Sequence, residues 1–370
     1  MKIMFICGSL EPGKDGVGDY TRRLCAELAK QGVLVSMLAY NDKHLTETVD
    51  KHRISENTKI PCLRLPHTYS SKLRCEAAKL WVDDFNPDWV SLQFVPYSYH
   101  DKGIPFRLAS QLKMICGTRK FQVMFHELWL GMNKQDSFKQ KIIGVIQKKI
   151  ITNLITSLNV KIVNTQSQLY NYMLQNNGNN PKLLPLFSNI PNVETKTQTK
   201  NNNTRLVVFG GVREGAPKEE LANEIVNFIN NHPNNIVSLT LVGKSGKEQQ
   251  NWADTFKSKN IEVYVIGEAS EFEVSRILNE SDYGIATTPL YLIEKSGTVA
   301  AMLEHNLPIL VVAKQWKPIF NFNMQIPNGI MEYKTGNFET FLNSVKKDGL
   351  NYNRGVTFVA ERFLSFINAS

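Results

Sequence analysis

The sequence predicts an α/β protein made of two Rossmann-like, doubly wound domains that face each other across a cleft. The chain has 370 residues, which suggests two cores on a prior of about 150 residues per domain. Short runs rich in β-branched and aromatic residues alternate with longer periodic stretches, as in parallel sheets covered by helices. One polar segment near residue 200 interrupts this alternation. These three observations define the fold class.

The first half alternates five strand candidates with helical stretches and forms one Rossmann-like unit. The expected strands are Lys2–Cys7, Val33–Tyr40, Trp89–Phe94, Phe121–Phe125 and Lys161–Asn164. The expected helices are Tyr20–Lys30, Ser71–Asp84, Phe138–Thr156 and Ser167–Leu174. Asp15 to Gly18 reads as turn material, so the first helix is expected to begin after Gly18.

The second half repeats the pattern after a polar linker. Its expected strands are Arg205–Phe209, Val237–Val242, Ile261–Ile266, Tyr283–Thr287 and Ile309–Val312, with helices near Lys218–Ile229 and from Gly297. The amphipathic segment Val359–Ile367 is expected to pack back on the first domain. The predicted organisation is a first Rossmann-like domain at 1–194, a linker at 195–204, a second Rossmann-like domain at 205–355 and a C-terminal helix at 356–370.

Composition excludes several classes of protein. Hydrophobic residues make up 42% of the chain, and no apolar run approaches the roughly 18–20 residues of a membrane span. The short apolar start runs directly into a glycine loop, which is typical of a first strand and not of a signal peptide, so we expect a cytoplasmic protein. The five cysteines include no CxxC pair or zinc-type cluster and are expected to be buried free thiols.

Positive charge is concentrated in one part of the chain. The net charge is +9, and residues 101–200 carry 14 basic against 4 acidic side chains. The stretch Gln135–Ser157 combines Lys139, Lys141, Lys148 and Lys149 with a row of Ile and Val. This pattern is typical of a helix at an anionic membrane surface and equally of a buried helix with a basic outer face. A peripheral position at the inner face of the plasma membrane therefore stays open, and so does an uncomplexed basic face.

Glycine loops follow the first strand of each half. Gly8 to Lys14 fits part of a P-loop, but Asp15 stands where that motif needs a Ser or Thr hydroxyl, which argues against an ATPase or GTPase. Gly16 and Gly18 instead offer backbone N–H groups to an anion before a helix. The second loop, Gly210 to Lys218, carries two cations suited to a diphosphate, Arg213 and Lys218. Glycines that serve only the turns, and ordinary surface cations, are the alternatives.

Two further segments are expected at carboxyl ends of strands. The stretch from Thr287 leads through Glu294 to a helix starting near Gly297, whose first N–H groups, those of Gly297, Thr298 and Val299, would be free to bind an anion. Glu294 would accept hydrogen bonds from sugar hydroxyls or act as a local cap. His126 follows the strand Phe121–Phe125 and is either functional or a structural histidine.

In this order, these motifs resemble the retaining GT-B glycosyltransferases of family 4, the group 1 glycosyltransferases, from residue 1 to about residue 320. The matching pieces are Gly8-Ser9 through Gly18, His126, Phe187 to Val193, Gly211-Val212-Arg213 with Lys218, Leu241-Val242-Gly243, and Glu294 through Leu310. The last piece resembles the E-x7-E region of that family. Its second glutamate should fall at Ala301 or Met302, and Glu304 comes too late, so the ribose contact departs from the pattern.

The resemblance implies transfer of a sugar from a nucleotide-sugar to a glycan, lipid-linked or other acceptor, with retention and without a metal or other cofactor. It also implies that the domain at 1–194 binds the acceptor and that the domain at 205–355 binds the nucleotide-sugar. The sequence contains no DxD carboxylate pair, so protein cations and a helix end would meet the charge of the leaving diphosphate. The implied catalytic residues are His126 and Glu294, and the implied donor-binding residues are Gly16, Gly18, Arg213, Lys218, Ser296, Gly297 and Thr298. A catalytically silent nucleotide-sugar-binding protein and a nucleic-acid-modifying transferase remain as alternatives, nucleic acid being the less favoured partner.

Overall fold

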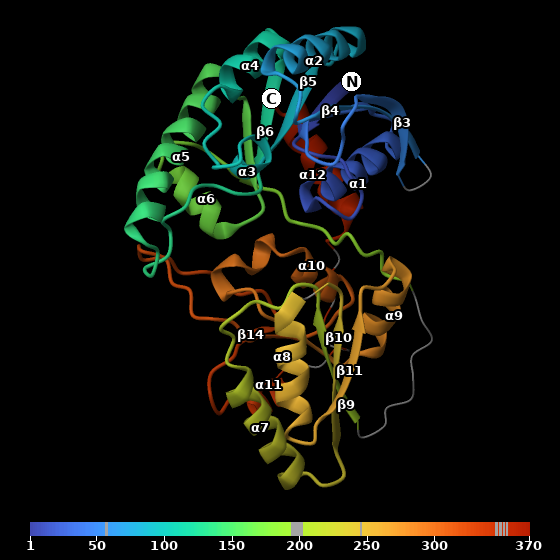
Figure 1. Cartoon of the computed structure of the whole chain (residues 1–370), viewed down its shortest axis with the longest axis vertical. Coiled ribbons are helices and arrows are strands. Elements are labelled where there is room, and N and C mark those ends of the chain that lie inside the picture. The colour runs from blue at the N-terminus through green and yellow to red at the C-terminus, as the bar shows by residue number, and fades with distance from the viewer. Residues whose placement is uncertain are drawn as a thin grey trace. The chain divides into compact units, whose positions relative to one another are not determined.

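The computed structural model describes residues 1–55, 58–193, 203–244, 246–344, 347, 350, 352 and 354–370. It divides into two compact α/β units (Figure 1). The first consists of Met1–Pro185, Pro318–Phe320 and Val356–Ser370, and the second of Leu186–Lys317 and Asn321–Gly355. Every strand expected from the sequence is present to within two residues at each end.

The first unit is built on one sheet in the order β3-β4-β2-β1-β5-β6-β7-β8. Its strands are β1 (Lys2–Cys7), β2 (Leu34–Asp42), β3 (Val49–Ser55), β4 (Thr58–Pro66), β5 (Trp89–Phe94), β6 (Lys120–Phe125), β7 (Ile162–Thr165) and β8 (Lys182–Leu183). All neighbours pair in parallel except β3, which is antiparallel to β4 at the edge of the sheet. The strand order reverses beside β1, so the loops after β1 and β5 meet at the topological switch point.

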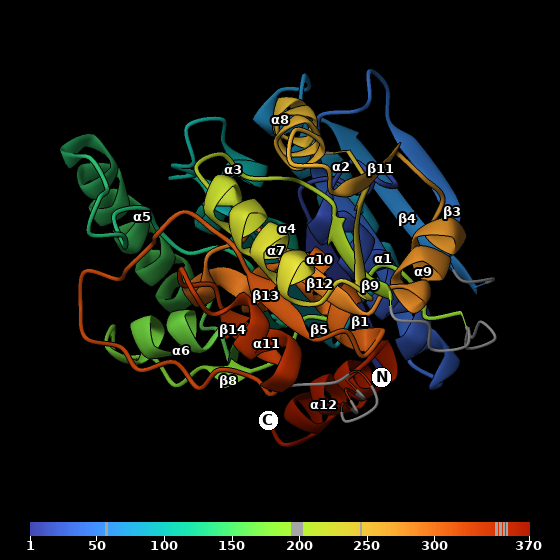
Figure 2. The same ribbon diagram turned by 90° about the horizontal axis from the view of Figure 1, so that it is seen from below.

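Seven helices of the first unit are described around this sheet. They are α1 (Gly16–Lys30), α2 (Ser71–Phe85), α3 (Pro96–Tyr99), α4 (Leu108–Cys116), α5 (Phe138–Ser157), α6 (Gln168–Gln175) and α12 (Val356–Asn368). The C-terminal helix α12 lies beside α1 (Figures 1 and 2), and Phe363 packs on Phe5 of β1 with ring centroids 5.7 Å apart. The end of the chain therefore completes the core of the first unit.

The second unit has the strand order β11-β10-β9-β12-β13-β14, with all neighbours parallel. Its strands are β9 (Asn203–Phe209), β10 (Ile236–Val242), β11 (Glu262–Gly267), β12 (Tyr283–Ala286), β13 (Ile309–Val311) and β14 (Ile330–Glu332). In order of appearance this is 3-2-1-4-5-6, the order of the Rossmann dinucleotide-binding sheet. Its switch point lies between β9 and β12.

Helices cover both faces of the second sheet. They are α7 (Lys218–Asn231), α8 (Gly246–Lys257), α9 (Glu271–Glu280), the 3-10 helix η1 (Leu290–Lys295), α10 (Gly297–Glu304) and α11 (Phe338–Ser344). Apolar residues of α7, α8 and α11 pack in one core with Leu206 and Val208 of β9. Those of α9 and α10 pack with Val207 in a second core. Alternate residues of β9 therefore serve opposite faces, as a fully covered parallel strand requires.

The boundary between the units falls before the polar segment. Of the linker expected at 195–204, residues 195–202 lie outside the described part, and Asn203 and Thr204 already belong to β9. Residues 186–193 cluster with the second unit, whereas the sequence placed them in the first. Hydrogen bonds explain this, because the N–H of Ser188 donates to Glu304 and that of Val193 to Ser275.

Two expectations about local structure can be settled here. All five cysteines are buried free thiols, as expected. The first helix begins at Gly16 and not after Gly18, because the Asp15 carboxylate accepts hydrogen bonds from the N–H groups of Val17 and Gly18 and so caps the helix three residues before the predicted start. Within the described residues, the helices are too short or too polar for any to cross a bilayer.

Candidate functional site

The switch point of the second unit brings together the loops after β9 and β12. The N–H of Arg213 donates to the Thr287 hydroxyl at 3.0 Å, and that hydroxyl donates to the Gly211 carbonyl at 3.2 Å. Thr287 is buried, so both bonds are shielded from water. The glycine loop and the segment leading to Glu294 therefore form one connected structure, as the two motifs require.

Two glycines allow the backbone to approach closely here. Gly210 has φ +81°, and a Cβ at this position would meet the Thr298 side chain at 2.4 Å. Gly243, at φ +103°, would place a Cβ 2.9 Å from Gly210 Cα. A larger residue at either position would push the β9 loop away from α10 or β10. The glycines thus bring the ends of β9 and β10 against the start of α10.

The N-terminus of α10 faces this loop. Ser296 caps the helix, and its hydroxyl lies 3.4 Å from the Thr288 hydroxyl and 3.0 Å from the Thr298 hydroxyl. The Val299 N–H, predicted to be free, donates to the Ser296 hydroxyl instead, because the cap uses it. The N–H groups of Gly297 and Thr298 have no acceptor among the described residues. Together with the helix dipole, these two groups suit an anion.

Cations surround this part of the second unit. The Arg213 side chain is exposed and makes no ion pair with any residue the structure describes. Lys218, predicted to share a diphosphate with Arg213, lies 3.9 Å from the Glu248 carboxylate of α8. Lys314, which belongs to none of the sequence motifs, follows β13 and packs over Gly215, where a Cβ would meet its side chain at 3.1 Å. The glycine loop therefore has a third cation that no motif signals.

Glu294 and Glu304, the glutamates in and after the expected E-x7-E region, have different surroundings. Glu294 is half-buried in η1, just before α10. Ala301 and Met302 are fully buried in the core, so neither reaches a ligand. Glu304 Oε1 accepts a hydrogen bond from the Ser188 N–H at 2.6 Å, and its carbonyl accepts one from the Asn192 side chain at 2.9 Å. Glu304 therefore anchors the segment before β9.

His126 lies in the first unit, at the carboxyl end of β6. It is 5% exposed, and its ring meets the Tyr20 ring edge-on with centroids 4.9 Å apart. The side chain of Gln166 donates to the His126 carbonyl at 3.1 Å and fixes the backbone. Burial lowers the pKa of His126 to about 3, because the charged imidazolium loses its hydration. The ring is therefore neutral at physiological pH.

A buried chain of amides determines which nitrogen of His126 carries the proton. Asn164 donates to the carbonyl of Lys182, and Gln122 donates to Asn164 Oδ1. Ser91 donates to Gln122 Oε1, and Gln93 donates to Ser91 Oγ.

The direction of this chain is fixed at its far end. A backbone carbonyl can only accept a hydrogen bond, so each amide in the chain must point its nitrogen towards the Lys182 end and its oxygen towards His126. Gln93 Oε1 is thus left facing His126 Nε2 at 2.9 Å, and Nε2 must be the donor. The neutral ring carries its proton on Nε2 and keeps Nδ1 as its acceptor.

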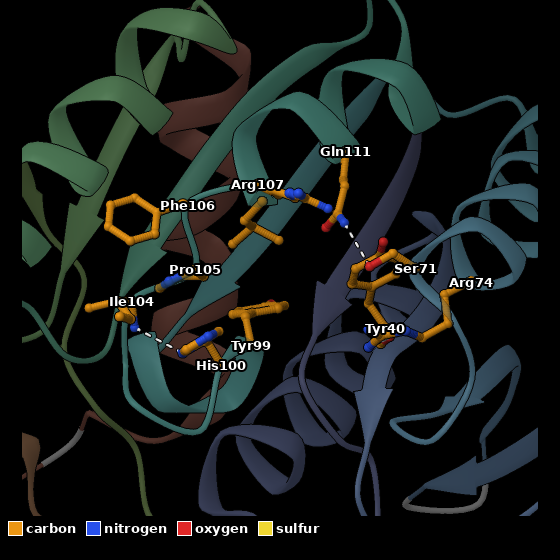
Figure 3. Close-up of a pocket in the computed structure, with 11 residues that line it drawn as sticks. Tyr40, Ser71, Arg74, Tyr99, His100, Ile104, Pro105, Phe106, Arg107 and Gln111 are labelled. Carbon is orange, nitrogen blue, oxygen red and sulfur yellow. Dashed lines mark hydrogen bonds between the residues drawn. The ribbon is translucent and has the colours of Figure 1, made fainter.

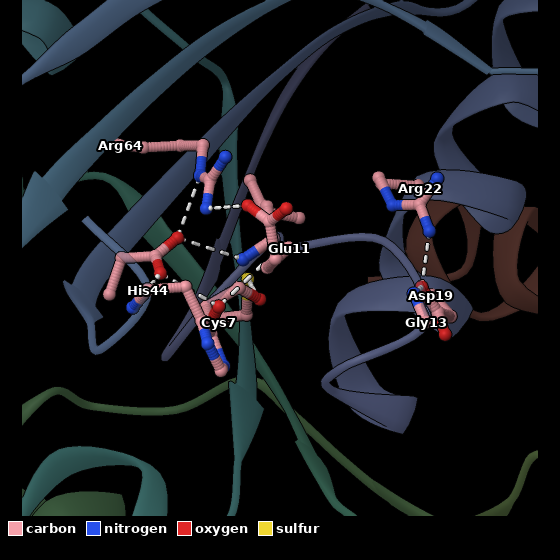
Figure 4. Close-up of polar contacts among 10 residues, drawn as sticks. Cys7, Glu11, Gly13, Asp19, Arg22, His44 and Arg64 are labelled. Atoms are coloured by element: carbon pink, nitrogen blue, oxygen red, sulfur yellow. Dashed lines mark hydrogen bonds and ion pairs between the residues drawn. The ribbon is translucent and has the colours of Figure 1, made fainter.

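The glycine loop after β1 is held in place by side chains of β2 and β4 (Figure 4). The buried Arg64 of β4 donates to Asp42 at 2.7 Å and to Glu11 at 2.6 Å, and the Ser9 hydroxyl donates to Asp42 at 3.0 Å. Burial alone would raise the pKa of Asp42, but the hydrogen bonds from Arg64 and the His44 N–H hold it below its ordinary value. This network ties residues 9–11 to β2 and β4.

The two predicted donor-binding glycines of this loop differ. Gly18 is buried, and a Cβ there would lie 2.5 Å from the Ser9 carbonyl, so packing of α1 accounts for it. Asp15 takes the N–H groups of Val17 and Gly18, which removes them as anion donors. Gly16 is exposed, and a Cβ there would meet open space. Of the two glycines, only Gly16 therefore remains a candidate for binding the donor.

The structure thus sorts the predicted site residues into two groups. Arg213, Ser296, Gly297 and Thr298 come together at the switch point of the second unit through Thr287 and Thr288. Lys218 begins α7, and Glu294 lies near the end of η1, just before α10. His126, Gly16 and Gly18 belong to the first unit, where α1 links them through Tyr20.

Comparison with known proteins gives a fold and no close relative. No protein-family model matches the chain, and a search of curated proteins finds no match. Among solved structures, TarM superposes with a TM-score of 0.60 at 9% identity, covering 99% of this chain and 98% of TarM. The lipopolysaccharide outer core galactosyltransferase WaaB in its apo form gives 0.56 at 16%, covering 100% and 98%.

A third solved structure is the UDP-GlcNAc 2-epimerase from Neisseria meningitidis bound to UDP-GlcNAc, with a TM-score of 0.56 at 10% identity and 100% of both chains covered. At these identities the likeness concerns the fold alone. It extends over both α/β units, each with the strand order described above. The chain therefore has the two-domain, Rossmann-like GT-B fold.

Proposed function

We propose that the protein is a glycosyltransferase that moves a sugar from a nucleotide-sugar to a glycan or lipid-linked acceptor, with retention and without a metal. The observation that carries this proposal is a group of hydrogen-bond donors suited to an anion at the switch point of the second unit. There, two N–H groups at the start of α10 and the exposed Arg213 adjoin the loop after β9. A Rossmann-type sheet binds the phosphates of nucleotides at this place.

Catalysis of transfer requires that the charge of the leaving diphosphate be stabilised as the glycosidic bond breaks. The N–H groups of Gly297 and Thr298 would hold one phosphate, and Arg213 would meet the developing charge. Lys218 would have to leave Glu248, a weak pair at 3.9 Å, to add a second cation. Lys314 is the better-placed alternative, because it already lies over the glycine loop.

His126 and Glu294 are the proposed sugar-contacting groups. A neutral His126 cannot supply a full positive charge, so its contribution is a hydrogen bond. Glu294 would accept hydrogen bonds from sugar hydroxyls. Because Ala301 and Met302 are buried, the ribose would be held by other groups than in the commoner pattern, and donor choice would differ accordingly.

A test of this proposal must distinguish sugar transfer from epimerisation of the nucleotide-sugar and from binding without reaction. Incubation of the protein with radiolabelled UDP-GlcNAc, UDP-glucose and UDP-galactose, with and without glycan and lipid-linked acceptors, distinguishes them. A labelled acceptor together with free UDP supports transfer, and NMR of the product's anomeric proton tests retention. Conversion to the 2-epimer, or binding with no product, would overturn the proposal.

We also propose that the protein binds an anionic membrane surface through α5. Phe138, Ile142 and Val145 recur at helical spacing and are 78%, 47% and 58% exposed. The opposite face of α5 is buried, and Gly144 lets Leu130 approach so closely that a Cβ would lie 2.0 Å from its carbonyl. An apolar stripe flanked by lysines suits the surface of an anionic bilayer.

Flotation with vesicles rich in phosphatidylglycerol tests this surface. The protein is expected to float with such vesicles, and the double variant Ile142→Ser/Val145→Ser to remain at the bottom. Leu80→Ser is the matched control, since Leu80 is a 73% exposed apolar residue on α2. If the wild type and both variants float equally well, or if none of them floats, the result would contradict a role for α5.

A further inference from the structure

A pocket of about 270 Å³ lies within the first unit, at the carboxyl edge of its sheet (Figure 3). It is lined by the end of β2, the start of α2, the segment after β5 and the start of α4. The lining residues are Tyr40, Ser71, Arg74, Tyr99, His100, Ile104, Pro105, Phe106, Arg107, Leu108 and Gln111. This volume falls slightly below the range of about 300–1,000 Å³ that is usual for small-molecule sites. It therefore suits one sugar ring better than an oligosaccharide.

The charge of this pocket is positive. Arg74 and Arg107 line it, and no carboxylate is among its described lining residues. Asp101 directly follows the lining residue His100 in the sequence, and its carboxylate forms an ion pair with Lys43 at 2.6 Å. An anionic group entering the pocket would meet two guanidinium groups and no competing acid.

The two arginines are available in different ways. Arg74 lies over the Tyr40 ring at 5.2 Å and uses Nη1 to bind the Tyr40 carbonyl and the Asn41 side chain. Its Nη2 has no partner among the described residues, so the side chain is held in place with donors to spare. Arg107 is exposed and makes no hydrogen bond or ion pair through its side chain to any described residue. One cation is thus fixed and the other is free to close on a ligand.

The remaining walls suit a sugar ring. Tyr99 turns its hydroxyl inward, to the carbonyls of Gln93 and Ile6, and so presents its ring to the pocket. His100 accepts hydrogen bonds from two backbone N–H groups through Nδ1, which makes Nε2 a donor when the ring is neutral. Phe106 is 63% exposed and adds a second aromatic surface. Aromatic faces with a few polar donors are the chemistry that binds carbohydrates.

The pocket is also connected to His126. Tyr99 donates to the backbone carbonyl of Gln93, and the side chain of the same Gln93 accepts from His126. One residue of β5 therefore supports both the pocket wall and the candidate catalytic ring. A ligand here would lie on the side of the first unit where transfer is proposed.

We propose that this pocket binds the acceptor and that the acceptor is an anionic sugar, a monosaccharide unit bearing a phosphate or a carboxylate. The inference rests on the proposed function, which supplies the role of acceptor. The anionic group is bound by Arg107 and Arg74, and the sugar ring packs against Tyr99 and Phe106.

Calorimetric titration of the full chain tests this pocket with four probes: glucose 6-phosphate, glucuronate, glucose and inorganic phosphate. One or both anionic sugars are expected to bind at least tenfold more tightly than glucose and than phosphate, and the better of the two identifies the group. Arg107→Ala is expected to weaken that binding by tenfold or more. Lys113→Ala, which removes an exposed cation of α4 outside the pocket, is expected to leave it unchanged.

Arg74→Lys provides a second variant that keeps the charge near Tyr40 and loses the planar fork. Binding of UDP-sugars, measured in parallel, is expected to be unaffected by Arg107→Ala, so a failed donor screen and a failed acceptor pocket are distinguishable. Equal affinity for glucose and the anionic sugars, affinity for phosphate alone, or wild-type affinity in both arginine variants would overturn the inference.

Discussion

The Nε2 atom of His126 lies 2.9 Å from Oε1 of Gln93, at the end of a buried hydrogen-bond chain that runs to the carbonyl of Lys182. The chain has one direction, because a carbonyl stands at its far end. It therefore holds His126 as the Nε2–H tautomer and leaves Nδ1 unprotonated, as a hydrogen-bond acceptor.

Removing the Gln93 amide is expected to release this tautomer. In the wild type at pH 7, long-range ¹H–¹⁵N NMR should show His126 protonated at Nε2 alone, and Gln93→Leu should give a mixture. Gln166→Ala is the control, since the Gln166 side chain donates to the backbone carbonyl of His126 and not to its ring. An Nδ1–H tautomer in the wild type would contradict the direction of the chain.

Protonation of His126 is expected to destabilise the protein at low pH. Its pKa is about 3 in the folded chain and 6.5 ordinarily, so between these values the unfolded chain binds a proton that the folded chain does not. Stability therefore falls as the pH is lowered from 6.5 towards 3, by up to about 1.4 kcal/mol per pH unit. Urea unfolding at several pH values should show a shallower dependence in His126→Gln. Parallel curves for the two proteins would mean that His126 is not buried as a neutral ring.

Glu304→Ala is expected to lower stability and leave donor binding intact. The Ser188 N–H, part-buried and 2.6 Å from the Glu304 carboxylate, would lose a charge-assisted partner, at a cost of about 1–3 kcal/mol. Urea unfolding measures the loss, and titration with a nucleotide-sugar checks the affinity. A variant that folds normally and loses donor affinity would show that Glu304 contacts the nucleotide after all.

The two glycines at the start of α1 are expected to respond differently to alanine. Gly18→Ala places a Cβ against the Ser9 carbonyl and should cost about 1–3 kcal/mol of stability. Gly16→Ala meets open space and should leave stability unchanged or raise it by up to about 1 kcal/mol. Thermal unfolding compares them. Because Gly16→Ala keeps the fold, any loss of donor affinity in this variant would place Gly16 on the phosphates, and wild-type affinity would remove it from the donor site.

Strand alternation and glycine loops could be predicted from the sequence because local periodicity encodes them. The edge of the first sheet could not. β4 contains Pro61, Pro66 and the buried Arg64, all of which argue against a strand, and only the distant Asp42 and Glu11 make Arg64 tolerable there. Such compensation between residues far apart in the chain leaves no local pattern.

The same reasoning applies to the candidate site. The start of α10 was predictable, because Ser296 followed by Gly297 is a local capping signal. Lys314 was missed, since its position over Gly215 depends on how β13 lies beside β12. The buried hydrogen-bond chain that ends at His126 was also not predicted. In the sequence, Gln93, Gln122 and Asn164 are isolated amides in apolar strands, and they become one chain only when β5, β6 and β7 pair.

The central claim is that the switch point of the second unit binds a nucleotide-sugar diphosphate through protein groups alone. The most direct measurement is a metal-free screen, with EDTA present, of UDP-, GDP-, ADP- and dTDP-sugars by thermal stabilisation and by release of the nucleoside diphosphate. We predict that at least one donor stabilises the protein and is slowly hydrolysed. Both effects should fall about tenfold or more in Arg213→Ala and persist in Lys257→Ala, an exposed cation at the far end of α8. A donor that binds only with added Mg²⁺, or equally well without Arg213, would contradict the account.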